Sequence, residues 1–156
     1  MQDAVTDRAG IVAPPPLIYL GVLGLGLILG RLWPTRLASS PVAVSLGCAV
    51  VVCGVIGLAA AIRTIWRAQT PISPYKPTTA LVTDGLFRFS RNPIYVSDTL
   101  IYVGLSLALN AWWALALTPA LVWIMQVGVI AREEIYLERK FGDDYLRYKR
   151  QVRRWL

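Results

Sequence analysis

The chain has 156 residues, of which 56% are hydrophobic and only 16% are charged, whereas soluble domains carry about 25% charged residues. It contains no histidine, which excludes histidine-based general-base catalysis and histidine-ligated metal sites. A chain of this length is expected to form one domain, 1–156, and its net charge is +7.

Four apolar stretches follow one another along the chain. Residues 17–30 and 42–62 contain no charged side chain, residues 94–110 contain only Asp98, and residues 111–131 again contain none. A helix needs roughly 17–25 apolar residues to cross the hydrocarbon core. Soluble helices this apolar would leave too little polar surface to cover them. We therefore predict an all-α polytopic membrane protein with about four transmembrane helices, over about 17–33, 42–63, 94–110 and 111–131.

Basic residues indicate the orientation of these spans. They concentrate between the second and third spans and after the fourth, and the turn around Asn110 has none. Because basic loops stay in the cytoplasm, the middle loop, the tail and both termini are predicted to be cytoplasmic. Arg31 and Arg36 are the exceptions on the opposite side. The expected location is the inner membrane of a prokaryote.

The loop 70–93 contains four prolines together with apolar and charged residues. Such a segment either folds against the helix ends and lines a cavity or lies in the interface as an amphipathic stretch. Asn92 is expected to cap the third span, which starts at Pro93, and the free N–H groups of that helix start attract carboxylates. Tyr95 and Asp98 share one face of this helix. Asp98 is predicted either to face a cavity or partner or to lie at the interface.

The hairpin of spans three and four returns the chain to the loop. It brings Arg132, Glu133 and Glu134 beside Arg91 and Tyr95. The two carboxylates are expected either to bind a cation or to form salt bridges with the arginines. The tail 132–156 has bulky residues at helical spacing, interrupted near Gly142, which predicts a cytoplasmic amphipathic helix on the inner leaflet. This tail accounts for the positive net charge without a nucleic-acid partner.

The order of these pieces resembles the isoprenylcysteine carboxyl methyltransferase and phospholipid methyltransferase family, in particular its small bacterial membrane members. The resemblance runs from about Pro77 to the C-terminus. The matching residues are Leu81–Phe87, Ser90–Tyr95, Arg132–Glu134, Phe141 and Gly142 with Tyr145 and Tyr148, and Val152–Trp155.

The resemblance implies S-adenosylmethionine as methyl donor, with no metal, bound in a cytosol-facing pocket. The implied donor contacts are Thr79, Ala80, Leu81, Val82, Phe87, Asn92, Pro93, Ile94, Tyr95 and Glu133. The chemistry of the residues agrees with this assignment: Arg91 and the helix start suit the donor carboxylate, and Glu133 suits its ammonium group. Leu81, Val82 and Phe87 suit the adenine or the reacting region.

The acceptor is expected to be lipophilic: an isoprenylcysteine-like carboxylate, a phospholipid amine or a small thiol. In-line methyl transfer needs mainly alignment and exclusion of water. The resemblance makes Arg132 the candidate for engaging the acceptor, because relatives place an arginine near the glutamates for that role. Glu134 or Asp98 is the candidate for accepting a proton from an amine. Two alternatives are an NADPH-dependent membrane reductase, which shares a similar C-terminal signature, and a non-enzymatic small membrane subunit.

Overall fold

The computed structural model describes residues 10–35, 41–71 and 76–156, and all regular structure in these ranges is helical. The elements are α1 (Pro15–Leu32), α2 (Pro41–Arg67), the 3-10 turn η1 (Gly85–Arg88), α3 (Pro93–Ala108), α4 (Trp112–Ala116), α5 (Thr118–Met125), the π-helical turn η2 (Gln126–Ile130), α6 (Ala131–Phe141) and α7 (Asp143–Gln151). Residues 1–9 of the predicted cytoplasmic N-terminus and 72–75 of the predicted donor loop lie outside the described ranges.

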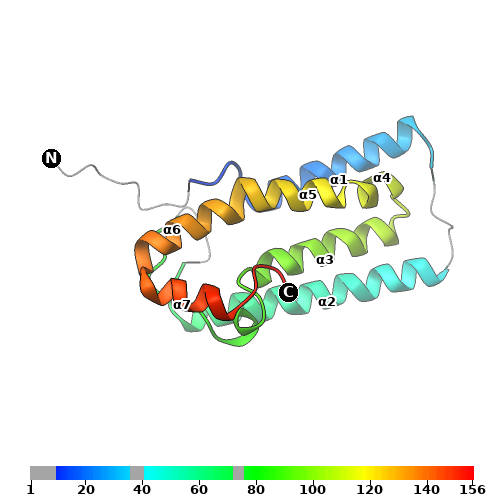
Figure 1. The fold of residues 1–156 in the computed structure, drawn as a ribbon. Coiled ribbons are helices and arrows are strands. Elements are labelled where there is room, and N and C mark those ends of the chain that lie inside the picture. The colour runs from blue at the N-terminus through cyan, green and yellow to red at the C-terminus, as the bar shows by residue number, and fades with distance from the viewer. Residues whose placement is uncertain (1–9, 36–40, 72–75) are drawn as a thin grey trace.

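The long helices lie side by side (Figure 1). α1 packs against α4 and α5, and α2 packs against α3 along most of its length. The helices α6 and α7 and the C-terminal residues gather at the end of the bundle where α3 begins (Figure 1). Helices α1, α2 and α3 each begin at a proline. Proline suits the first helical position because an N–H group there would have no carbonyl acceptor within the helix.

Glycines allow α2 and α3 to approach closely. A Cβ atom at Gly54 would lie 2.7 Å from Ile101 Cγ1 and 2.9 Å from the carbonyl oxygen of Ser97. A Cβ atom at Gly104 would lie 2.7 Å from the carbonyl oxygen of Gly47. Small residues at such contacts let helix backbones pack tightly in membranes. The close approach holds the start of α3 in place relative to α2.

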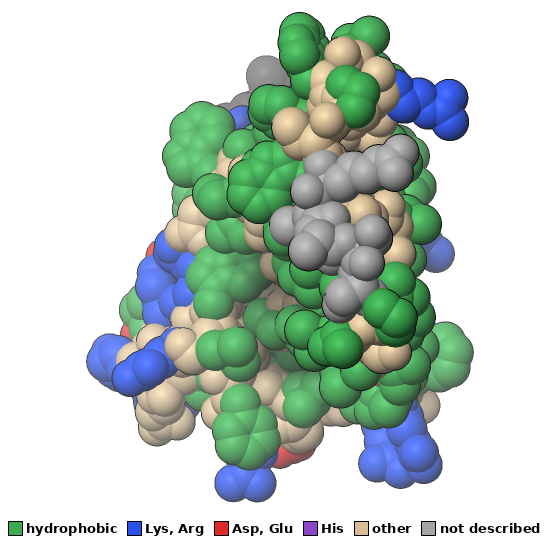
Figure 2. Space-filling model, turned by 90° about the vertical axis from the view of Figure 1, so that its right-hand side faces the viewer, with side chains coloured by type: hydrophobic (Ala, Val, Ile, Leu, Met, Phe, Trp, Pro, Cys, Tyr) green, Lys and Arg blue, Asp and Glu red, His purple; other side chains and the backbone are tan. Residues whose placement is uncertain are grey.

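Two helices meet the length and hydropathy needed to cross a membrane. These are α1 and α2, with 18 and 27 residues, and α3 is a shorter apolar helix of 16 residues. The large apolar side chains of α1 and α2 are mostly exposed, Leu20 and Ile56 among them. Seen from the end where α3 turns into α4, the surface is mostly hydrophobic, with basic side chains at its margins (Figure 2). The exposed apolar side chains along α1 and α2 suit lipid better than water.

The predicted span 111–131 differs from one uninterrupted α-helix. It consists of α4, α5 and η2 in succession. Pro119 has no N–H group to donate to the carbonyl of Leu115, and Thr118 Oγ1 donates to that carbonyl instead, at 2.7 Å. The π-helical turn that follows is a feature often found at functional sites. It leads directly into α6, which carries both glutamates of the site.

The C-terminal tail forms two helices with a sharp turn between them. α6 ends at Gly142, whose φ of 53° is a conformation that glycine adopts without strain. α7 then buries Tyr145 and Tyr148 against the protein. The predicted interruption at Gly142 is therefore present, whereas the position of the tail on a leaflet stays a prediction.

Candidate functional site

A cavity of about 150 Å³ lies where the loop before α3, the start of α3, α6 and α7 meet. It is mainly apolar, with a few charged and polar groups. Its lining residues are Ile65, Thr70, Pro71, Thr78, Ala80, Leu81, Val82, Phe87, Arg91, Asn92, Pro93, Ile94, Tyr95, Glu133, Glu134, Tyr136, Leu137, Tyr145 and Tyr148.

Most residues that the sequence singles out line this cavity. Three do not. Thr79 has its hydroxyl directed away, donating to the carbonyl of Gln69 at 3.1 Å. Arg132 is exposed and its Nη1 donates to the carbonyl of Gly10 at 2.8 Å. Asp98, on α3, is half-buried and lies outside the lining.

Sequence reasoning missed several lining residues. Thr70, Thr78 and Tyr136 carry no motif, and they reach the cavity only because the loop folds between α2 and α6. Tyr145 and Tyr148 belonged to the resemblance but had no assigned role. Their spacing of three residues in an otherwise strongly charged segment is the sequence signal that could have placed both on one inward face.

The start of α3 is held by the C-terminal residues. Asn92 occupies the N-cap position, but its side chain makes no capping hydrogen bond, contrary to the expectation from sequence. Its Nδ2 donates instead to the carbonyl of Arg154, at 2.9 Å. The Asn92 N–H group donates to Ser90 Oγ at 3.1 Å. The Asn92 side chain therefore binds the carbonyl of Arg154 and does not cap α3.

Glu133 pairs with Tyr95 at the wall of the cavity. The Tyr95 hydroxyl donates to Glu133 Oε1 at 2.7 Å. Desolvation raises the pKa of Glu133 to about 7, although the hydrogen bond from Tyr95 lowers it. The carboxyl group therefore changes charge near neutral pH, and an adjacent cation would favour its ionised form.

Glu134 has a different environment from its neighbour. It is 5% exposed and accepts hydrogen bonds from Arg154 Nε at 2.9 Å and Arg154 Nη2 at 2.6 Å. Arg91 Nη1 lies 3.0 Å from Glu134 Oε1. Both oxygens of Glu134 are therefore engaged by guanidinium groups. This carboxylate therefore has its charge paired within the protein, in contrast to that of Glu133.

Arg91 is the cation that faces the cavity with unused donors. Its side chain is 9% exposed, and its Nε and Nη1 atoms make no hydrogen bond with any residue in the described ranges. A buried guanidinium with free donors is an unfavourable arrangement unless an anion completes it. The cavity thus places one cationic residue, Arg91, and the carboxyl group of Glu133 among mainly apolar lining residues.

Two hydroxyl groups hold the loop that covers the cavity. Thr70 Oγ1 accepts from the N–H of Thr79 at 2.9 Å and from that of Ala80 at 3.4 Å. The Tyr136 hydroxyl accepts from the N–H of Thr78 at 3.1 Å. Three consecutive amide groups of the loop are therefore satisfied by side chains of α6 and of the residues after α2.

Replacing Thr70 with Val should lower the free energy of unfolding by about 1–3 kcal/mol, because two loop N–H groups lose their acceptor. Thermal unfolding in detergent micelles measures the change. Thr83→Val is the matched control, since Thr83 is exposed in the same loop. Equal melting temperatures for the two variants would show that Thr70 does not hold the loop.

The residues in the described ranges contain no group of three or more acidic, cysteine or histidine side chains that could hold a metal ion.

Comparison with known families matches residues 42–144, more than half of the chain, to the phospholipid methyltransferase family. The chain belongs to this family. Membership indicates a membrane-associated methyltransferase, and the matched region contains the loop, α3 and both glutamates of the cavity.

Two relatives show how far the similarity extends. A Haemophilus influenzae protein of uncharacterised function is 49% identical over 63 residues. The match covers 36% of the present chain and 100% of that relative. The protein-S-isoprenylcysteine O-methyltransferase of Schizosaccharomyces pombe is 33% identical over 72 residues, 46% of this chain. The match spans only 30% of the length of the S. pombe enzyme.

Proposed function

We propose that the protein transfers a methyl group from S-adenosylmethionine to a lipophilic acceptor at the cytoplasmic face of the membrane. The whole chain, 1–156, would act as one membrane domain with four spans and cytoplasmic termini. The observation that carries the proposal is the buried Arg91 with unused donors, which shares an apolar cavity with Glu133. The family match favours neither a reductase nor a non-enzymatic subunit.

The charges of the cavity fit the amino-acid part of the donor. Its carboxylate would take the free donors of Arg91, and its ammonium group would lie against Glu133. The adenine would occupy the apolar wall that includes Ile65, Val82 and Phe87. S-adenosylmethionine, when bound, supplies an activated methyl group. The orphaned donors of Arg91 are what its binding would satisfy.

The protein residues then need to orient the reactants and exclude water. The loop, the start of α3, α6 and α7 line the cavity with mainly apolar side chains, which would favour both tasks. Glu134 is engaged by two arginines, and Asp98 lies outside the lining. Because neither is placed to accept a proton in the cavity, we favour acceptors that react in an ionised form, such as a carboxylate or thiolate on a lipophilic chain. Arg132 would then act at the rim, beside the N-terminal segment that it contacts.

Transfer of labelled methyl groups into a detergent-solubilised lipid extract tests the proposal. Methylated product is expected with the wild-type protein. Calorimetric titration with S-adenosylmethionine at millimolar concentration provides a second measurement. Absence of binding in that titration would contradict the proposal, and preferential stabilisation by NADPH would favour a reductase instead.

Donor binding should depend on pH through Glu133. Its raised pKa of about 7 means that the carboxyl group is neutral at lower pH and ionised at higher pH, and only the ionised form attracts the donor ammonium. Affinity should therefore rise up to about tenfold per pH unit below pH 7 and level off above it. Titrations between about pH 5.5 and 7.5 measure this dependence.

Glu133→Gln should bind the donor weakly and with no such pH dependence. Asp143→Asn is the control, because Asp143 is exposed at the start of α7. It should retain the wild-type pH profile. A Glu133→Gln variant with that same profile would assign the titration to another group.

A further inference from the structure

Arg91 and Arg154 share the carboxylate of Glu134, but unequally. Arg154 binds both oxygens, with Nε 2.9 Å from Oε1 and Nη2 2.6 Å from Oε2. Arg91 Nη1 lies 3.0 Å from Oε1 without making a hydrogen bond there. The bidentate geometry, the stronger of the two, thus belongs to Arg154. Arg91 thus forms an ion pair with Glu134, but its Nε and Nη1 atoms have no hydrogen-bond partner in the described ranges.

The position of Arg154 is set by the chain end, which folds back over the site. The carbonyl of Arg153 accepts from the N–H of Arg91 at 2.9 Å, and that of Arg154 accepts from Asn92 Nδ2. Trp155 Nε1 donates to Gln126 Oε1 in η2 at 2.9 Å. Residues 152–155 therefore join the start of α3 to the η2–α6 wall. We call these residues the C-terminal strap.

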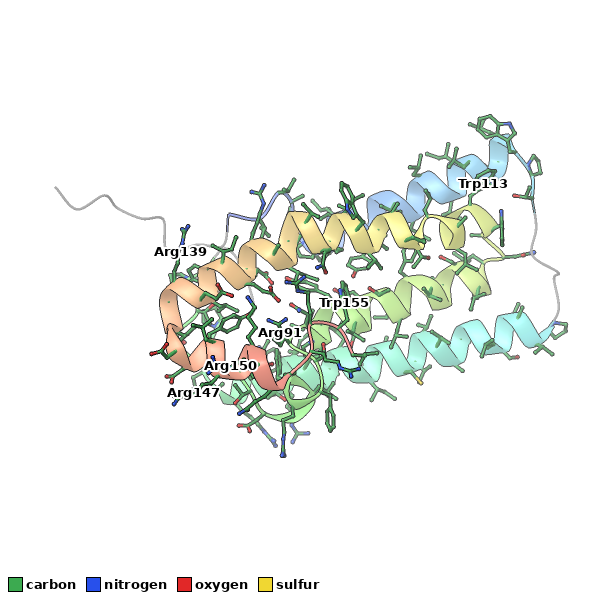
Figure 3. The ribbon with its side chains drawn as sticks, in the orientation of Figure 1. Arg91, Trp113, Arg139, Arg147, Arg150 and Trp155 are labelled. Carbon is green, nitrogen blue, oxygen red and sulfur yellow. The ribbon has the colours of Figure 1, made fainter. Side chains whose placement is uncertain are left out.

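Figure 3 shows the result of this folding. Arg91 and Trp155 lie on the inner side, between α3 and the C-terminal helices. Arg139 and Arg147 lie at the outer edge of the molecule (Figure 3). The basic tail therefore has two parts: exposed arginines of α6 and α7, and the strap, whose Arg154 reaches a buried carboxylate.

We propose that Arg154 is a positioning residue that occupies Glu134 and so keeps the free donors of Arg91 available to the anionic group of a ligand. This inference rests on the proposed function, in which that group is the donor carboxylate. Without Arg154, Glu134 would have Arg91 as its only guanidinium partner. Arg91 would then form the bidentate pair itself, and its donors would be lost to the ligand.

The test measures the affinity of four proteins for S-adenosylmethionine and for its decarboxylated analogue: wild type, Arg154→Ala, Arg154→Ala with Glu134→Gln, and Arg150→Ala. Arg154→Ala should bind S-adenosylmethionine about tenfold to a hundredfold more weakly, with little change for the analogue. The added Glu134→Gln change should restore most of the affinity, because Arg91 then has no carboxylate to pair with. Arg150 is exposed on α7, and its replacement should change neither affinity.

A purely structural role for the strap predicts a different pattern. Arg154→Ala would then weaken both ligands equally, and Glu134→Gln would not restore binding. Either result overturns the inference. Rescue by Glu134→Gln is the decisive comparison. If the strap had only a structural role, removing a second buried charged group would lower the affinity for S-adenosylmethionine further.

A ligand-free measurement separates this inference from the proposed function. In ¹⁵N-arginine spectra of the protein in nanodiscs, the Arg91 Nε–H signal, assigned by its loss in Arg91→Lys, should shift and exchange more slowly in Arg154→Ala as the new pair with Glu134 forms. An unchanged signal contradicts the inference whatever the ligand. If wild type does not bind S-adenosylmethionine but the signal shifts as expected, the proposed function fails and the positioning role stands.

Discussion

Arg91→Ala is expected to weaken binding of S-adenosylmethionine by roughly a hundredfold, because charge-assisted hydrogen bonds contribute about 1.5–3 kcal/mol each. The side chain is 9% exposed, and two of its nitrogen atoms have no hydrogen-bond partner in the described ranges. A ligand carboxylate would satisfy these donors. Calorimetric titration of the purified protein measures the change.

The fold should survive this substitution. Glu134 keeps its bidentate partner Arg154, so no buried carboxylate is left without a cation. Arg91→Lys preserves the charge but not the planar fork, and an intermediate loss of about tenfold is expected. Arg88→Ala is the matched control, because Arg88 is exposed in η1, three residues earlier. Binding by Arg91→Ala within twofold of this control would remove Arg91 from the site.

Gly104→Val should have the largest effect on stability. A Cβ atom there would lie 2.7 Å from the carbonyl oxygen of Gly47 and 2.7 Å from the backbone nitrogen of Val51. Both atoms are main chain and cannot move aside, so α2 and α3 would have to separate. Overpacking of this kind lowers the free energy of unfolding by about 3 kcal/mol. Thermal unfolding in micelles and the yield of monodisperse protein are the measurements.

Gly21→Val controls for the change of residue type. Gly21 lies in α1 with nothing within 4 Å of the added Cβ, so its replacement should leave the melting temperature nearly unchanged. Gly104→Val should also weaken donor binding, because α3 carries Tyr95 into the cavity. Equal melting temperatures for the two variants would mean that the α2–α3 contact is looser than the structure shows.

Much of the fold follows from local sequence patterns. Apolar runs predict the helices α1 and α2, and Pro93 marks the start of α3. The hairpin prediction places Glu133 near Tyr95, and the two side chains are 2.7 Å apart. Pro119, in the first turn of α5, marks the break between α4 and α5 within the fourth predicted span. These features depend on neighbours in the sequence, or on a single chain reversal at the turn around Asn110.

The roles of the adjacent glutamates were decided by the tertiary structure. Consecutive residues on a helix point about 100° apart, so Glu133 and Glu134 reach different partners. Glu133 meets Tyr95, while Glu134 meets Arg91 and Arg154. The sequence offered Glu134 or Asp98 as the proton acceptor, and it does not show that both oxygens of Glu134 are paired with arginines.

By itself, the sequence determined a helical membrane protein with a loop and helix start that resemble a methyltransferase site. It did so because hydropathy and short motifs are local properties of the chain. Only the tertiary structure decided that Arg132 points away from the cavity and that Arg154 returns to Glu134, 20 residues earlier in the chain. The physical reason is that side-chain direction and the path of the chain beyond Gly142 depend on packing between distant segments. All arginines carry the same charge, so the sequence does not show which of them pairs with the buried carboxylate of Glu134. Packing between distant segments decides it.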